Sequence, residues 1–160
     1  MQTHKITPFL WFDANAEEAV TFYASIFADS RVIETSRWGE GGPGKPGSVM
    51  GMTFDLGGQR FHAMNGGPQY KFTPAVSLFV ACETQAELDT YWDALLRGGG
   101  SRSQCGWLVD RFGLSWQIVP SILAGLLGDP DRSKAGRAMN AMLKMQKLDI
   151  AALERAHAAR

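Results

Sequence analysis

The chain contains an internal repeat, which restricts the folds available to it more than any single motif does. Each copy reads as a strand, a helix and then further strands. A shift of 69 residues places the first helix start, Asn15, on Thr84, and a shift of 55 residues places His62 on Gln117 in the closing hairpins. The shifts differ because the first copy holds an insertion, the glycine- and proline-rich segment 39–47. We therefore expect two half-open sheets, related by pseudo-symmetry, that close around a shared cleft.

The first copy alternates between the two-residue period of strands and the longer period of a helix. Its helix begins at Asn15, whose side chain is expected to cap the first turn, and Gly57-Gly58 forms a hairpin turn. Segment 39–47 holds five glycines and two prolines and is expected to be a mobile loop. The first strand is apolar on both faces, so we expect both faces to be covered. Strands are expected at residues 6–13, 30–37, 49–56 and 59–64.

The second copy follows the same order. A strand is expected at 75–81, and Thr84 begins a helix through a Thr-x-x-Glu capping box. The stretch Trp107–Pro120 then reads as two strands joined by a tight turn at Asp110–Gly113. In the second of these strands, Gln117 is the one long polar group on its face. Such an amide fits the floor of a pocket, and it fits equally well a hydrogen-bonded residue on a half-wet sheet.

The C-terminal part of the chain has a helical pattern of its own. Asp129, followed by Pro130, is expected to cap one helix, and Asp149 a short last one. The apolar face of this tail is rich in methionine, which fills irregular gaps in cores. We expect it to pack on its own subunit or across a dimer. The residues of this face are Ala138, Met139, Met142, Leu143 and Met145.

Composition excludes several classes of function. Lys+Arg and Asp+Glu both number 16, so the formal charge is zero, and we expect no nucleic-acid partner and no membrane partner. The apolar runs are far shorter than the roughly 20 residues of a membrane span, and the N-terminus has no apolar signal core. We therefore expect a cytoplasmic protein with Cys82 and Cys105 as reduced thiols. Zero charge and many aromatic residues are compatible with a homodimer.

Four segments together span nearly the whole chain: ITPFLWFDANAEEAVTFYASIF, GQRFHAMNGGP, CGWLVDRFGLSWQIVP and AMLKMQKLDIAALERA. They resemble the vicinal oxygen chelate superfamily of glyoxalases, extradiol dioxygenases and bleomycin-resistance proteins. Within it the chain is similar to the PhnB-like family, often labelled 3-demethylubiquinone-9 3-methyltransferase. The resemblance implies an α+β fold in one compact domain. Its parts would be a βαβββ module at 1–68, a second at 73–121 and a helical tail at 129–160.

The methyltransferase label finds no support in the residues. A typical methyltransferase has a glycine-rich turn between a strand and a helix of a doubly wound sheet. Here the glycine-rich segment 39–47 is followed by a strand, and Gly98–Gly100 follows a helix.

Metal-dependent members of the superfamily hold a divalent ion on the first and last strands of each module, usually through His and Glu. Carried over by the repeat, these positions are Pro8, His62, Ser77 and Gln117. His62 is a good ligand, Gln117 is a weak neutral one, and the set carries no negative charge. We therefore expect no tightly bound catalytic metal and no other cofactor, with a divalent metal as the alternative.

A metal-free cleft still offers chemistry. His62 could act as a general base, and Ser77 and Gln117 could orient a polar ligand. The first hypothesis is therefore a protein that binds or sequesters a small, partly apolar molecule. The alternatives are a metal-dependent lyase, isomerase or dioxygenase, a His62-based acid–base enzyme, and a structural dimer module. Apolar walls of the cleft are expected from Leu10, Phe12, Met64, Phe79 and Val119.

Overall fold

The computed structural model describes residues 5–159, and the chain divides into two compact units, Met1–Phe72 and Thr73–Arg160. The predicted first module and the predicted tail reach residues 1 and 160, which lie outside the described residues. The tail belongs to the second unit. Within residues 5–159, none of the helices has the length and apolar character needed to cross a membrane.

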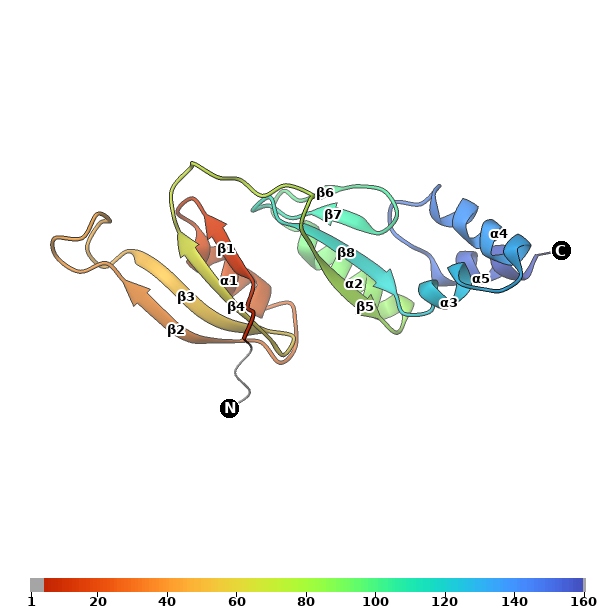
Figure 1. Cartoon of the computed structure of the whole chain (residues 1–160), viewed down its shortest axis with the longest axis horizontal. Coiled ribbons are helices and arrows are strands. Elements are labelled where there is room, and N and C mark those ends of the chain that lie inside the picture. Colours follow the sequence, from red (N-terminus) through yellow and green to blue (C-terminus); the bar gives the residue numbers. More distant parts are fainter. Residues whose placement is uncertain (1–4, 160) are drawn as a thin grey trace. The chain divides into compact units, whose positions relative to one another are not determined.

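The first unit is a four-stranded sheet with one helix, coloured from red to yellow in Figure 1. The strand order is β1-β4-β3-β2, with β1 parallel to β4 and the other neighbours antiparallel. This is the βαβββ module that the sequence predicts. Its elements are β1 (Phe9–Phe12), α1 (Ala16–Ala24), β2 (Arg31–Arg37), β3 (Val49–Leu56) and β4 (Gln59–Asn65).

α1 covers one face of this sheet, and alternate side chains of β1, β3 and β4 are buried beneath it. The other face is open, and Phe9 on it is 60% exposed, so the structure differs from the expectation that the first strand is covered on both faces. The strand also begins at Phe9 rather than at Ile6, directly after Pro8, which has no N–H for a ladder. The buried residues between sheet and helix include Leu10, Phe12, Ala16, Ala19, Val20, Tyr23, Phe54, Phe61 and Ala63.

The start of α1 is held by a residue that the sequence analysis does not select. The side chain of Asn15 makes no capping hydrogen bond, so that prediction is wrong. Instead, Oδ1 of Asn65 at the end of β4 accepts a hydrogen bond of 2.9 Å from the backbone N–H of Ala16. Its Nδ2 donates to the carbonyl of Val49 at 3.1 Å. One side chain therefore joins α1, β3 and β4.

Asn65→Ala is expected to lower the free energy of unfolding by about 1–2 kcal/mol, because it removes a helix cap and a hydrogen bond to β3. Asn15→Ala is the matched control, with an expected change within about 0.5 kcal/mol. Urea unfolding followed by circular dichroism measures both variants. Equal losses would show that Asn65 does not cap the helix.

Segment 39–47 joins β2 to β3 and folds around the indole of Trp38. The backbone N–H of Trp38 donates to the carbonyl of Ser48 at 2.9 Å, and the N–H of Gly47 donates to the carbonyl of Trp38 at 2.8 Å. A Cβ on Gly44 would overlap the indole. The glycines therefore make room for Trp38, and the predicted mobility of the segment stays a prediction.

The second unit repeats the order of the first, as the sequence predicts. Its sheet has the order β5-β8-β7-β6, with β5 parallel to β8 and the other neighbours antiparallel, and α2 covers one face. The predicted capping box is present: Oγ1 of Thr84 accepts from the N–H of Glu87 at 3.2 Å, and the Glu87 carboxylate accepts from the N–H of Glu83 at 2.7 Å. The elements are β5 (Ser77–Cys82), α2 (Gln85–Leu96), β6 (Ser101–Arg102), β7 (Trp107–Val109) and β8 (Ser115–Pro120).

The turn between β7 and β8 is built on the carboxylate of Asp110, which is 3% exposed. Its Oδ1 accepts hydrogen bonds from the N–H groups of Phe112 at 2.8 Å and Leu114 at 3.1 Å. Its Oδ2 accepts from the indole N–H of Trp116 at 2.8 Å. The N–H of Gly113 closes the predicted turn onto the Asp110 carbonyl at 3.0 Å. The same carboxylate thus shapes the turn and orients a core indole.

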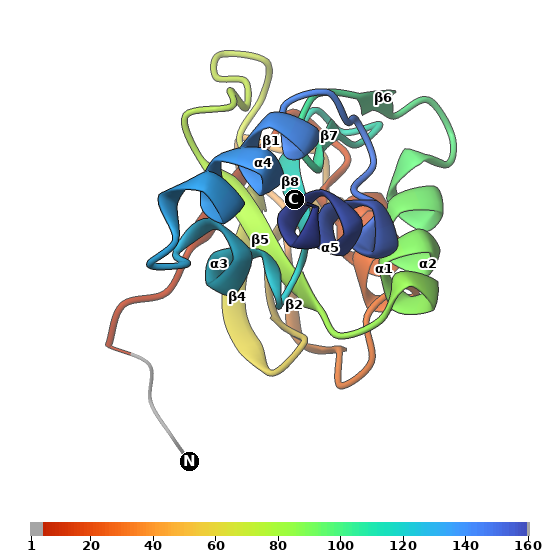
Figure 2. The ribbon, with the colours of Figure 1, turned by 90° about the vertical axis from the view of Figure 1, so that its right-hand side faces the viewer.

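The tail forms three short helices that pack on one another, α3 (Leu123–Leu127), α4 (Arg132–Met142) and α5 (Ile150–Ala158), as Figure 2 shows. The sequence analysis does not predict α3. It also assigns the wrong cap to α4, because Asp131 and not Asp129 accepts from its first-turn N–H groups. Asp129 instead accepts from the N–H of Asp131 at 2.7 Å and contacts Nε2 of His157 at 2.8 Å. The predicted cap of α5 by Asp149 is confirmed.

The tail is tied to the rest of the second unit by hydrogen bonds to the tail's backbone. The side chain of Gln85 on α2 donates to the carbonyl of Leu148 at 3.1 Å and accepts from the N–H of Ile150 at 2.9 Å. The N–H of Gly106 donates to the carbonyl of Gln146 at 2.7 Å. Of the Met-rich face, Ala138 is buried and Met139 and Leu143 are exposed within this chain, so packing of these two across a dimer stays a prediction.

Candidate functional site

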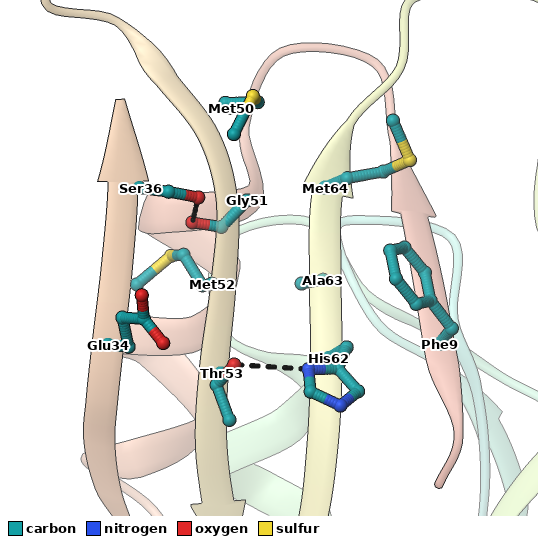
Figure 3. A pocket seen from close by; sticks show the side chains of 10 residues that line it. All are labelled: Phe9, Glu34, Ser36, Met50, Gly51, Met52, Thr53, His62, Ala63 and Met64. Carbon is teal, nitrogen blue, oxygen red and sulfur yellow. Dashed lines mark hydrogen bonds between the residues drawn. The ribbon is translucent and has the colours of Figure 1, made fainter. Parts of the chain in front are cut away.

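A pocket of about 280 Å³ lies on the open face of the first sheet, opposite α1. Figure 3 shows that strands β1 to β4 all contribute to it. Most of the lining is apolar, with a small group of polar side chains. The lining residues are Phe9, Glu34, Ser36, Met50, Gly51, Met52, Thr53, His62, Ala63 and Met64.

The strand register places the polar groups in one row across the sheet. His62 on β4 pairs with Phe9 on β1 and with Thr53 on β3, and Thr53 pairs with Glu34 on β2. Paired residues of neighbouring strands present their side chains to the same face. The four side chains Phe9, His62, Thr53 and Glu34 therefore stand side by side over the pocket (Figure 3). We call them the His62 row.

A β-bulge is needed to bring Glu34 into this row. Arg31 and Val32 pair with successive residues of β3, but the register shifts between Val32 and Glu34, so that Ile33 is the extra residue. Without this bulge, strict alternation would turn Ile33 toward the pocket and Glu34 away from it.

His62 is held in place by both of its neighbouring strands. Its backbone N–H donates to the carbonyl of Pro8 at 2.9 Å. Its Nδ1 shares a hydrogen bond of 3.1 Å with Oγ1 of Thr53, and its ring lies 5.8 Å from the ring of Phe9, centroid to centroid. The hydrogen bond at Nδ1 leaves Nε2 as the ring nitrogen available to a ligand.

An ion cluster around the buried carboxylate of Asp55 occupies the next row of the same face. Asp55 on β3 accepts hydrogen bonds from the guanidinium groups of Arg60 and Arg31, the latter at 3.3 Å. The hydrogen bond from Arg60 is the main cause that holds the pKa of Asp55 below its ordinary value of 3.8, and burial opposes it in part. Both arginines next to the pocket are therefore already paired.

The stability that Asp55 contributes is expected to depend on pH. Since its pKa is lower in the folded than in the unfolded chain, this contribution is complete above the unfolded value near 3.8 and is lost as pH falls through the folded value. The difference in unfolding free energy between the wild type and Asp55→Asn should therefore be constant from pH 7 to pH 5 and shrink below pH 3.8. Urea unfolding at a series of pH values measures it. A difference that grows on acidification would contradict the assignment.

The second unit holds the other predicted polar site residues. Nε2 of Gln117 on β8 donates to Oγ of Ser77 on β5 at 2.9 Å, and Phe79 pairs with Gln117 in the register and is exposed. Val119 is buried. Oγ of Ser115, also on β8, is the one buried side-chain polar atom without a hydrogen bond among the described residues.

The structure corrects part of the predicted apolar wall. Leu10 and Phe12 are 7% and 2% exposed and face α1, so they do not line the pocket that holds His62 and Met64. The reason is the parallel register, which pairs Phe9 with His62 and thereby sends the even-numbered residues of β1 to the opposite face. Glu34, Thr53, Met50 and Phe9 are pocket residues that the sequence analysis does not select. The alternation of β1 and the pairing of β3 with β4 could have indicated Phe9 and Thr53.

The register also shifts one of the predicted metal positions. Phe9 and Phe79 are the residues paired with His62 and Gln117, so the residue equivalent to Ser77 in the first module is Thr7 and not Pro8. The connection between the first strand and the helix is one residue longer in the first module. The 69-residue shift that aligns the two helix starts therefore misaligns the two first strands by one residue. Thr7 offers a hydroxyl, which is a weak ligand like Ser77.

The carried-over positions supply few side chains that could hold a divalent metal. Ser77 and Gln117 are hydrogen-bonded to each other, and His62 is the one strong donor among the carried-over positions. Residues 5–159 contain no group of three or more His, Cys, Asp or Glu side chains that could hold a metal ion.

The two cysteines are free thiols. Burial is the main cause that raises the pKa of the Cys82 thiol to about 12, so this residue is not a nucleophile at neutral pH. Sγ of Cys105 donates to the carbonyl of Met142 at 3.7 Å, a contact within the tail interface.

Comparison with known proteins agrees with the fold of the modules. The PhnB protein from Bacillus cereus is 41% identical, with a TM-score of 0.69 over 74% of this chain and 100% of the other. Protein PA1353 from Pseudomonas aeruginosa is 22% identical, with a TM-score of 0.59 over 73% and 96%. The fosfomycin resistance protein FosX from Mesorhizobium loti is 14% identical, with a TM-score of 0.52 over 72% and 90%, a likeness of fold alone. No curated protein matches the chain.

The paired βαβββ modules define a protein of the vicinal oxygen chelate superfamily, with the glyoxalase/bleomycin-resistance type of fold. A family model described as 3-demethylubiquinone-9 3-methyltransferase matches residues 4–119. The chain belongs to this family, the PhnB-like proteins.

Proposed function

We propose that the protein binds a small, partly apolar molecule in the pocket of the first sheet, without a tightly held catalytic metal. The observation that carries the proposal is the pocket itself, in which methionine and phenylalanine side chains surround the polar groups of the His62 row. Small-molecule sites combine a largely apolar lining with a few polar groups that fix orientation. Their usual volumes begin near about 300 Å³, so this pocket suits a small ligand.

The family description does not change this proposal. Segment 39–47 joins two antiparallel strands, and Gly98–Gly100 follow α2, so neither lies in the strand-to-helix turn on which a doubly wound methyltransferase binds its cofactor. Fold and family labels do not by themselves assign a reaction.

A His62-based acid–base enzyme is the second candidate, and the Thr53 hydrogen bond favours it. A hydroxyl bonded to Nδ1 fixes the imidazole and leaves Nε2 for a ligand, an arrangement suited to proton transfer. Its test is substrate turnover that His62→Ala abolishes and that Thr53→Val slows.

The proposal includes a cytoplasmic homodimer. Several large apolar side chains are exposed on the described surface and would be covered in such a dimer. Light scattering at micromolar concentration should give twice the mass of the chain, and the mass of a monomer would defeat this part. Outside the pocket, the exposed side chains include Tyr70, Val76, Phe79 and Leu143.

The methionines allow the pocket to be tested without knowledge of the natural ligand. With ¹³C-methyl methionine, small neutral probes such as 4-phenylbutanol, benzyl alcohol and cyclohexanol should shift the methyl signals of Met50 and Met64 at concentrations up to about 10 mM. The methionines of the tail, Met139, Met142 and Met145, are the internal control and should not respond. If none of the probes shifts the pocket methyl groups, the proposed function is wrong.

The metal-free part is tested on the same protein. Addition of Zn²⁺ or Mn²⁺ should leave the melting temperature within about 1 °C, because a single strong donor gives little binding energy to couple to folding. A large rise that His62→Ala removes would show that a metal is bound there.

A further inference from the structure

We propose that the ligand of this pocket is an elongated amine: an apolar group at one end and an ammonium group at the other, held by Glu34. This inference rests on the proposed function, since it names the class of molecule that the same pocket takes. It goes beyond the predicted site residues, which do not include Glu34.

Glu34 is the one carboxylate in the pocket lining and makes no ion pair among residues 5–159. It differs in this from Asp55 in the neighbouring row, which pairs with two arginines. The Glu34 side chain is exposed to solvent beside the apolar walls of the pocket, and an ammonium group brought there by a ligand would be attracted to its charge. The unmatched charge of the pocket therefore favours a cation.

The backbone directs this carboxylate toward the pocket. The bulge at Ile33 brings Glu34 into register with Thr53, and so into the row that ends at Phe9. Such bulges recur beside binding sites because they re-aim a single side chain.

The row also sets the shape of the ligand. Glu34 and Phe9 stand at opposite ends of a four-strand row, and neighbouring strands lie about 4.8 Å apart, so about 14 Å separates the two backbones. A molecule with its amine at Glu34 would place an apolar end near Phe9 and Met64, and would pass over Thr53 and His62. A short chain with a ring at its end has this form.

An anionic ligand fits the described residues less well. After the imidazole of His62 in the row itself, the guanidinium groups of Arg31 and Arg60 are the nearest basic groups on this face, and both bind the Asp55 carboxylate. An anion in the pocket would therefore face Glu34 without an unpaired arginine to offset it.

Three probes of the same ring and chain separate the charge from the shape: 4-phenylbutylamine, 4-phenylbutanol and 4-phenylbutanoate. Titrations followed at the methyl groups of Met50 and Met64 should show the amine binding about fivefold more tightly than the alcohol, with the acid weakest. Glu34→Gln keeps the side-chain shape and should bring the amine to within about twofold of the alcohol. The alcohol itself should bind the variant as before. Raised salt should also reduce the preference for the amine.

Glu18→Gln is the matched control, because it removes the same charge from α1, on the other face of the sheet, and should leave all three affinities unchanged. An amine that binds no better than the alcohol, or a preference that survives Glu34→Gln, overturns the inference. The same is true if the acid binds best. In each of these cases the alcohol still shifts the pocket methyl signals, and the proposed function stands. If none of the three probes shifts those signals, both the inference and the proposed function are wrong.

Discussion

Asp110→Ala is expected to lower the free energy of unfolding by about 3–5 kcal/mol, the largest effect we predict for a single substitution. The carboxylate accepts three hydrogen bonds. Two of the donors, the backbone N–H of Leu114 and the indole N–H of Trp116, belong to residues that are buried in the second unit. Each buried donor that loses its partner costs about 1–3 kcal/mol. The turn that joins β7 to β8 would also lose the side chain that organises it.

Asp110→Asn separates these contributions. Its carbonyl oxygen can still accept from the two backbone N–H groups, but its amide nitrogen would face the indole N–H as a second donor. We therefore expect an intermediate loss, and a smaller one in a Trp116→Phe background, where the indole donor is gone. Urea unfolding monitored by circular dichroism gives all four values of this cycle. A loss below about 1 kcal/mol for Asp110→Ala would contradict the assigned role.

Gly106→Ala is the second large effect, with an expected loss of about 2–4 kcal/mol. Gly106 has a φ of +84°, where an alanine is strained. A Cβ there would also lie 2.8 Å from the carbonyl oxygen of Ile118 and 3.0 Å from Cδ1 of Leu148. The backbone cannot move aside easily, because Gly106 accepts from the N–H of Ile118 and donates to the carbonyl of Gln146.

Gly113→Ala is the matched control for Gly106→Ala. Its φ of +88° imposes nearly the same backbone strain, and a Cβ would meet no atom within 4 Å. We expect a loss of about 1 kcal/mol there, so the difference between the two variants measures the close packing at Gly106 alone. Thermal and urea unfolding of both should agree on the order. Equal losses of unfolding free energy in the two variants would show that the close contacts of a Cβ at Gly106 do not destabilise the fold.

The order of the elements could be predicted because local signals carry it. Thr84 and Glu87 lie three residues apart and form the predicted capping box, and Asp110 and Gly113 form the predicted turn. Such features depend on residues close in sequence, and so a repeat of them can be recognised. The cap of α1 shows the limit: Asn65 is 49 residues from the N–H that it accepts from, and nothing near Asn15 indicates it.

The candidate site could be predicted only in part, for a related reason. His62 and Met64 follow from the alternation of one strand, but the face they share with β1 depends on a parallel register that no local pattern gives. For this reason the sequence alone does not show that Leu10 and Phe12 lie on the buried face. The position of Glu34 in the pocket depends in addition on the bulge at Ile33. On an exposed edge strand the pattern of apolar and polar residues does not show where an extra residue lies. The predicted cleft shared by the two modules stays a prediction.

The contacts of the tail matter for any truncation of this chain and for its comparison with relatives that lack the tail. The family model ends at residue 119, yet Gly106, inside the matched range, is hydrogen-bonded to Gln146 and packed against Leu148 outside it. A fragment trimmed to the matched range would expose the surface that Leu148 and Leu153 now cover. Gly106, just before β7, and Gln85 on α2 are thus held by a segment that lies outside the family match. Tolerance to substitution inferred from relatives without that segment would be overestimated at those positions.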